Sequence, residues 1–169
     1  GIGFTSVLPV SDITSGARAA EEHGYESLWV TEGSGKDAFS QLIAAGLTTK
    51  RLGLATGVIP VFSRTPYLLA MSACALDEVS GGRCILGLGV GHRAFVEGTH
   101  GVPFDRPQQR LREYVTLLRA LFSDQPVSFQ GQVVRLPTAR RPYPLKGRVP
   151  IYTAVLSLSM ARVAGEIAD

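Results

Sequence analysis

Short apolar runs alternate with helix-like patterns along the chain, and this alternation restricts the possible folds more than any other feature of the sequence. Each run has the length and the near-continuous apolar character of a strand that is buried on both faces. Strands separated by helices are typical of βα units, which build a parallel sheet. The sequence therefore predicts an α/β fold with strands over 2–8, 25–31, 52–59, 84–88 and 149–155.

The segments between these strands carry helix signals at their ends. Ser11 or Asp12 is predicted to cap a first helix that runs to residue 23, and Gly24 follows its end. Pro66 fits the first turn of a helix that is expected to end at Ser80 and Gly81. Further helices are expected over 37–47 and 111–122, and a last helix begins after Ser157 or Ser159.

Five consecutive βα units fit either an open sheet or the first five-eighths of a closed TIM (β/α)8 barrel. A closed barrel takes about 250 residues, whereas this chain has 169. We expect a single domain over 1–169, with a small hairpin inserted at about 127–136, and a chain that is part of something longer. The last strand is then an edge that further residues or a partner must cover.

A glycine-rich loop follows the fourth predicted strand, at the place where ligands gather in parallel α/β folds. Gly87, Gly89 and Gly91 leave backbone amides there without shielding side chains. The run does not fit a nicotinamide fingerprint, because a long loop containing a proline follows where a helix should begin directly. The loop therefore predicts a small-molecule site of another kind.

Charge and composition exclude several classes of partner. The formal charge of +3 is concentrated in the loop at 135–148, which is rich in proline and poor in stacking aromatic residues, so we expect no nucleic acid partner. No apolar run approaches the roughly 18 residues that span a bilayer, and no signal peptide begins the chain, so we expect a cytoplasmic protein with no membrane partner. Cys74 and Cys84 lie in helix and strand patterns, which predicts reduced core residues and no metal site.

Several motifs stand in a fixed order along the chain. They are SLWVTE at 27–32, RLGLATGV at 51–58, LD with SGGR between 76 and 83, LGLGVG at 86–91, VEGTHGVPF at 96–104 and REYV at 112–115. In this order they resemble the luciferase-like monooxygenase family of flavin- and deazaflavin-dependent TIM barrels. The last two are most similar to the coenzyme F420-dependent oxidoreductases related to methylenetetrahydromethanopterin reductase. The resemblance implies a partial barrel of this type, a small-molecule substrate and a homodimer.

The resemblance also implies roles for residues at two strand ends. Related deazaflavin enzymes have a non-prolyl cis peptide behind the cofactor ring, where this chain has Gly57 and Val58; an ordinary glycine bulge is the alternative. Glu32 stands where relatives place a catalytic carboxylate or histidine, and the alternative is a structural Glu32 paired with a neighbouring loop. Luciferase-like relatives often have histidine next, whereas this chain has Gly33, which argues against oxygenase chemistry.

The loop after the fourth strand supplies further candidates. Gly89 and Gly91 would let the backbone approach a flat cofactor ring, and Arg93 would meet a negatively charged ligand. Glu97 is the second candidate for catalytic proton transfer. His92 adjoins the same ligand, and a plain surface position in the loop is its alternative.

The turn after the fifth strand contains Leu156 and Ser157. Its free amides and the dipole of the helix that follows would form an anion site, and relatives bind the cofactor phosphate near this position. An ordinary serine cap is the alternative, since relatives tend to have glycine or proline here.

Three functions remain open at this point. The first is an oxidoreductase that uses coenzyme F420 for hydride transfer to or from an organic substrate. The second is an FMN-dependent monooxygenase of the luciferase type. The third is an incomplete barrel that acts as a binding or assembly module through its exposed edge.

Overall fold

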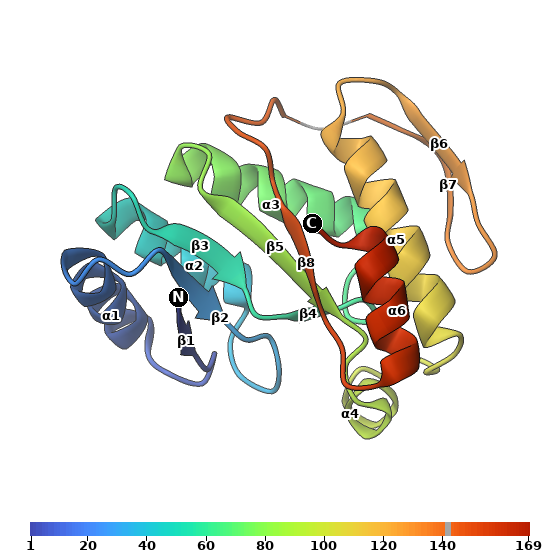
Figure 1. Cartoon of the computed structure of the whole chain (residues 1–169), viewed down its shortest axis with the longest axis horizontal. Helices are drawn as coiled ribbons and strands as arrows, with labels where there is room; N and C mark the ends of the chain where they lie inside the picture. The colour runs from blue at the N-terminus through green and yellow to red at the C-terminus, as the bar shows by residue number, and fades with distance from the viewer. Residues whose placement is uncertain (141–142) are drawn as a thin grey trace.

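A parallel sheet forms the centre of the computed structural model, which describes residues 1–140 and 143–169 (Figure 1). Its strands are β1 (Ile2–Phe4), β2 (Ser27–Val30), β3 (Gly53–Thr56), β4 (Ile59–Pro60), β5 (Cys84–Gly89) and β8 (Ile151–Ala154). The order is β1, β2, β3, β5, and β5 also pairs with β4 and β8; every one of these pairs is parallel. This confirms the predicted α/β class and the first part of a barrel, with β1 and β8 at its two open edges.

Helices cover one side of the sheet and pack against one another in chain order. They are α1 (Val10–Glu22), α2 (Ala38–Thr48), α3 (Pro66–Ser80), α4 (Arg93–Thr99), α5 (Pro107–Phe122) and α6 (Leu158–Ile167). α1 packs on α2, α2 on α3, α3 on α5 and α5 on α6, so the short α4 stands outside this layer. Figure 1 shows α4 and the beginning of α6 beside the carboxyl end of β5.

The two faces of the strands differ in burial. Leu28 and Val30 of β2 are completely buried, whereas Trp29 between them is only partly buried. Trp29 contacts Tyr152 of β8 edge to face, with ring centroids 5.7 Å apart, although the two strands are not neighbours in the sheet. The sheet therefore curves so that its concave face brings β2 and β8 together, as expected for part of a barrel wall.

The pairing register shifts by one residue between β3 and β4. Leu54 lies opposite Cys84, whereas Ile59 lies opposite Leu88, so one extra residue is accommodated between them. The peptide bond between Gly57 and Val58, within this stretch, is cis. The predicted strand over 52–59 is thus two strands that meet the same edge of β5 on either side of this bulge.

Several predicted ends of elements are wrong by a few residues. β1 stops at Phe4, because Thr5 begins a turn in which the amide of Leu8 donates to the Thr5 carbonyl at 3.3 Å. α1 begins at Val10 after Pro9, so neither Ser11 nor Asp12 caps it. Other signals are confirmed: Pro66 opens α3, Gly81 ends it with a φ of 69°, and Ser157 caps α6.

An antiparallel hairpin lies against α5, outside the parallel sheet, at the position expected for an insertion (Figure 1). It consists of β6 (Val127–Gln130) and β7 (Arg135–Ala139), so it extends three residues beyond the predicted 136. The buried carboxylate of Glu113 on α5 accepts hydrogen bonds from the amides of Gln132, Val133 and Val134 at 2.7–3.0 Å. One carboxylate therefore fixes the turn of the hairpin to the helix layer.

Residues 1–140 and 143–169 contain neither a membrane-spanning helix nor a metal-binding cluster. Within these residues, no helix is both long and apolar enough to cross a bilayer. Within the same residues, no group of three or more histidine, cysteine or acidic side chains is arranged to hold a metal ion. Residues 141 and 142 of the basic loop fall outside this description.

Candidate functional site

A pocket of about 360 Å³ lies at the carboxyl ends of β5 and β8. Its wall comes from three places in the chain: the turn before β4, the loop after β5 and the turn that opens α6. Six of the predicted cofactor-binding residues line it together, namely Val58, Gly89, Gly91, His92, Leu156 and Ser157. The size is at the lower end of the range of roughly 300–1,000 Å³ found for small-molecule pockets.

Glycine is required at two positions of this wall. A Cβ atom on Gly89 would lie 2.8 Å from Cγ2 of Val58 and 3.4 Å from the carbonyl oxygen of Ala154. Gly91 has a φ of 70°, a left-handed conformation in which a side chain is strained. The backbone at Gly89 and Gly91 therefore forms a smooth surface, which an aromatic ring can approach closely.

The turn before α6 contributes an apolar and a polar group. Leu156 is 91% exposed, so it presents an apolar side chain at the rim of the pocket. The hydroxyl of Ser157 accepts a hydrogen bond from the amide of Met160 at 3.3 Å and so caps α6. The positive end of the α6 dipole thus faces the same pocket, which suits a negatively charged ligand group.

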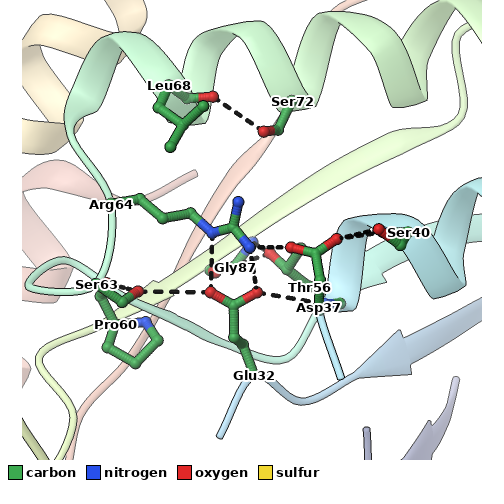
Figure 2. Close-up of polar contacts among 11 residues, drawn as sticks. Glu32, Asp37, Ser40, Thr56, Pro60, Ser63, Arg64, Leu68, Ser72 and Gly87 are labelled. Atoms are coloured by element: carbon green, nitrogen blue, oxygen red, sulfur yellow. Dashed lines mark hydrogen bonds and ion pairs between the residues drawn. The ribbon is translucent and has the colours of Figure 1, made fainter. Parts of the chain in front are cut away.

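Glu32 lies outside this pocket, in a cluster of charged side chains at the carboxyl end of β2 (Figure 2). Its two carboxylate oxygens accept hydrogen bonds from Nε and Nη2 of Arg64 at 2.9 and 2.7 Å. The amide of Ala38 also donates to this carboxylate at 3.3 Å, and the hydroxyl oxygen of Ser63 lies 3.5 Å from it. The structural alternative for Glu32, pairing with a neighbouring loop, is the one that this geometry favours.

Asp37 belongs to the same cluster and ties it to α2. Its carboxylate caps the helix by accepting from the amide and the hydroxyl of Ser40, both at 2.6 Å, and it also pairs with Arg64. Burial raises the pKa of Asp37, but the hydrogen bonds from Ser40 and Arg64 outweigh burial and hold that pKa below its usual value. The hydrogen bonds to Glu32 are the main cause that raises the pKa of Arg64, so Asp37 and Arg64 are both held in their charged forms.

Arg93 and Glu97 pair with each other on the exposed face of α4. Nη1 of Arg93 lies 2.7 Å from Oε1 of Glu97, and the guanidinium lies over the ring of Phe104 at 5.0 Å. The same Glu97 oxygen accepts from the amide of Phe104 at 3.1 Å. Neither side chain lines the pocket at Gly89, so their proposed contacts with a ligand stay predictions.

The remaining predicted residues lie beside the pocket or at its edge. Gly57 adjoins Val58, and a Cβ atom there would lie 3.2 Å from Cβ of Trp29 on the concave face. His92 lines the pocket but is exposed. Arg64 was not among the residues predicted from the sequence. Its position between the end of a strand and the Thr65-Pro66 start of α3 was the one sign that it lies at the carboxyl edge of the sheet.

Known proteins that are similar in sequence point to one family. The family model described as luciferase-like monooxygenase matches residues 5–169. A Mycobacterium tuberculosis protein, named provisionally as a coenzyme F420-dependent oxidoreductase, is 35% identical over 99% of this chain and 52% of its own length. The 5,10-methylenetetrahydromethanopterin reductase of Methanolobus tindarius is 31% identical over the whole of this chain and 52% of its own.

A solved structure is similar in fold as well as in sequence. The coenzyme F420-dependent tetrahydromethanopterin reductase of Methanopyrus kandleri superposes with a TM-score of 0.89 and 25% identity, over 99% of this chain and 53% of that one. The chain thus spans about half the length of the curated relatives it matches. On the match of the family model over nearly all of its residues, the chain belongs to the luciferase-like monooxygenase family.

Proposed function

We propose that this protein is an oxidoreductase that binds the deazaflavin coenzyme F420 at the pocket beside Gly89 and Gly91. A hydride passes between the cofactor and a small organic substrate. The observation that carries the proposal is the convergence of Val58, the two glycines and the Leu156-Ser157 turn on one pocket. The names of the F420-dependent relatives support the choice of cofactor.

The residues present fit such a cofactor. A flat tricyclic ring needs an apolar slot without protruding side chains, and a Cβ atom at Gly89 would fill part of that slot. The N-terminus of α6 at Ser157 suits the phosphate of the cofactor. When bound, the deazaflavin would supply a ring carbon that gives or takes a hydride. The chain contributes the surface that holds the ring and keeps water away from one of its faces.

The two carboxylates proposed as catalytic, Glu32 and Glu97, are each paired with an arginine and lie outside this pocket. Their pairing supports roles in holding the loops around the site. A direct part in proton transfer remains a proposal for Glu97, whose side chain is 42% exposed and thus accessible to a substrate that enters from solvent.

An FMN-dependent monooxygenase is the second candidate, and the name of the family favours it. Gly33 argues against it, because no imidazole follows Glu32 to manage protons around an oxygen adduct. A binding or assembly module that pairs through an edge strand of the sheet is the third candidate. We also propose that the protein forms a homodimer and is located in the cytoplasm.

The single tryptophan of the chain gives a direct test of the cofactor. Trp29 lies beside Gly57, next to the turn that lines the pocket, so a bound ring should quench its fluorescence. We expect saturable quenching by oxidised F420 and a weaker effect of FMN at the same concentration. In a Trp29→Phe variant only the tyrosines fluoresce. The apparent quenching in this variant measures how much exciting light the added cofactor absorbs, and it is subtracted. Tighter binding of FMN, with oxygen-dependent turnover, would replace the first candidate by the second, and a folded chain that binds neither would support the third.

A further inference from the structure

Arg64 connects the loop between β2 and α2 to the segment before α3 at the carboxyl edge of the sheet, although its side chain does not line the pocket at Gly89. We propose that Arg64 is a positioning residue: by pairing with Glu32 and Asp37, it fixes the segment 57–65 and with it the Val58 wall of the cofactor pocket. The inference rests on the proposed function, since it assigns that pocket to the deazaflavin. It also assigns Glu32 the role of an anchor for Arg64.

The first step is the rigidity of the ion pairs. Arg64 meets Glu32 with two parallel hydrogen bonds, and the side chains of the pair are only 15% and 11% exposed (Figure 2). Such a two-pronged contact fixes the guanidinium in orientation as well as in distance, which a lysine cannot reproduce. Because Asp37 holds the same guanidinium and caps α2, Arg64 is tied to both β2 and α2.

The second step is the connection from Arg64 to the pocket through the backbone. The amide and the hydroxyl of Ser63 donate to the carbonyl of Pro60 at 3.0 and 2.8 Å, which closes a tight turn just before Arg64. The amide of Val61 donates to the carbonyl of Gly89 at 2.8 Å. The segment is therefore fastened to a pocket glycine at Val61 and to the ion pairs at Arg64, and Val58 lies three residues before Val61.

The third step is that the backbone of Arg64 is also held from the helix layer. The hydroxyl of Tyr114 on α5 donates to the carbonyl oxygen of Arg64 at 2.9 Å. The side chain is thus pulled toward β2 and α2, whereas the main chain is held by α5. A shorter or more flexible side chain at residue 64 would have to give up one of these contacts, and the segment 57–65 would gain freedom.

The test compares Arg64→Lys and Arg64→Met with the wild-type chain and with Arg119→Lys as a matched control. Arg119 pairs with Asp169 at 3.3 Å near the amino ends of the strands, far from the pocket wall. Hydrogen exchange of the peptide that covers 57–65 is measured without cofactor, together with a reference peptide from the β6–β7 hairpin. Fluorescence titration and the absorption spectrum of bound F420 are measured on the same variants.

We expect Arg64→Lys to speed exchange in 57–65 about fivefold or more and to leave the hairpin unchanged. The affinity for F420 should fall by a similar factor, and the absorption spectrum of the bound ring should change. Arg64→Met should have a larger effect than Arg64→Lys on both the exchange rate and the affinity. Exchange that rises equally in the hairpin, or that stays at the wild-type rate in both Arg64 variants, overturns the inference. If the wild-type chain binds no cofactor, the proposed function fails. The inference on Arg64 is then decided by hydrogen exchange: exchange that rises more in 57–65 than in the hairpin supports it, and an equal rise overturns it.

Discussion

The hydroxyl of Thr56 bridges the backbone of Gly87, donating to its carbonyl oxygen at 2.9 Å and accepting from its amide at 2.8 Å. Thr56 ends β3, just before the register shift, where the regular ladder to β5 is interrupted. A side chain therefore satisfies two buried polar groups that would otherwise lack a partner at this level of the sheet.

Thr56→Val should destabilise the fold, because valine keeps the shape but leaves the amide and the carbonyl of Gly87 unpaired. The expected loss is about 2–6 kcal/mol, since each of the two buried polar groups left without a partner costs about 1–3 kcal/mol. Urea unfolding measures the change, and Thr56→Ser is the control, as it keeps the hydroxyl. Equal stability of the valine and the serine variants would contradict the bridging role.

Gly87→Ala should be more damaging still. A Cβ atom on Gly87 would lie 2.0 Å from the carbonyl oxygen of Thr56, and backbone cannot move aside as a flexible side chain can. We expect a loss of at least about 3 kcal/mol or failure to fold, beyond the usual range of about 1–3 kcal/mol for an overpacked core. Gly165→Ala is the matched control: it lies within α6 in open space and should gain about 0.5–1 kcal/mol. Similar effects at the two glycines would rule out the steric argument.

Gly89→Ala should weaken cofactor binding more than it weakens the fold. The new methyl group would press on Cγ2 of Val58, a side chain in the pocket, so the slot narrows. We expect a loss of about tenfold in F420 affinity, measured by quenching of Trp29, which corresponds to about 1.4 kcal/mol. Adding Val58→Ala should restore part of the affinity, and Gly98→Ala, whose Cβ meets nothing within 4 Å, should have no effect. If Gly89→Ala binds F420 with unchanged affinity, the cofactor does not bind in the pocket beside Gly89.

Glu113→Gln should destabilise the fold in a manner that depends on pH. Burial raises the pKa of Glu113, but hydrogen bonds from Gln109 and from the hairpin amides prevail, so the folded-state pKa is below the ordinary 4.5. A depressed carboxyl pKa adds stability that is complete above the unfolded-state pKa and disappears as the pH falls through the folded-state pKa.

We therefore expect Glu113→Gln to cost about 1–3 kcal/mol at pH 7, and to cost less below the ordinary carboxyl pKa of 4.5. Thermal unfolding of both proteins between pH 3 and pH 7, at about one-unit steps, gives the difference. A cost that does not change with pH would show that packing, and not charge, makes the contribution of Glu113.

The two cysteines should not react in the native protein. Both are buried, and burial raises the pKa of the Cys84 thiol, so little Cys84 thiolate exists at neutral pH. A chromogenic disulfide reagent should label neither residue in the time that it takes to label both in guanidinium. Rapid labelling of the folded chain would mean that the helix layer opens locally above Cys74 or Cys84.

The order of the longer strands and helices could be predicted from the sequence, because the spacing of apolar residues follows the buried face of each element. It could not place α4, since Arg93–Thr99 is only seven residues long and contains Gly98, so no periodic face develops. It also joined β3 to β4, because a register shift leaves no mark in hydrophobicity. Ends of elements depend on local hydrogen bonds, as at Pro9, where the neighbouring Ser11 and Asp12 bond to each other at 3.2 Å.

The candidate site was predictable only in part, for a related reason. Glycines after a strand indicate close approach of a ligand, and Gly89 and Gly91 do meet Leu156 and Ser157 in one pocket. The partner of Glu32, in contrast, is Arg64, and a contact across 32 residues is set by how the loops fold together. Spacing along a chain carries no information about such a pairing.

The extra residue accommodated between Thr56 and Ile59 also limits how this gene can change. Removing one residue there would make the pairing continuous, with Ile59 still opposite Leu88, but the bulge that carries Val58 into the pocket wall would be lost. Adding one residue would enlarge the bulge or displace Ile59 and Pro60 from Leu88 and Gly89. Functional homologues of this protein should therefore vary in residue identity across that stretch but keep its length constant.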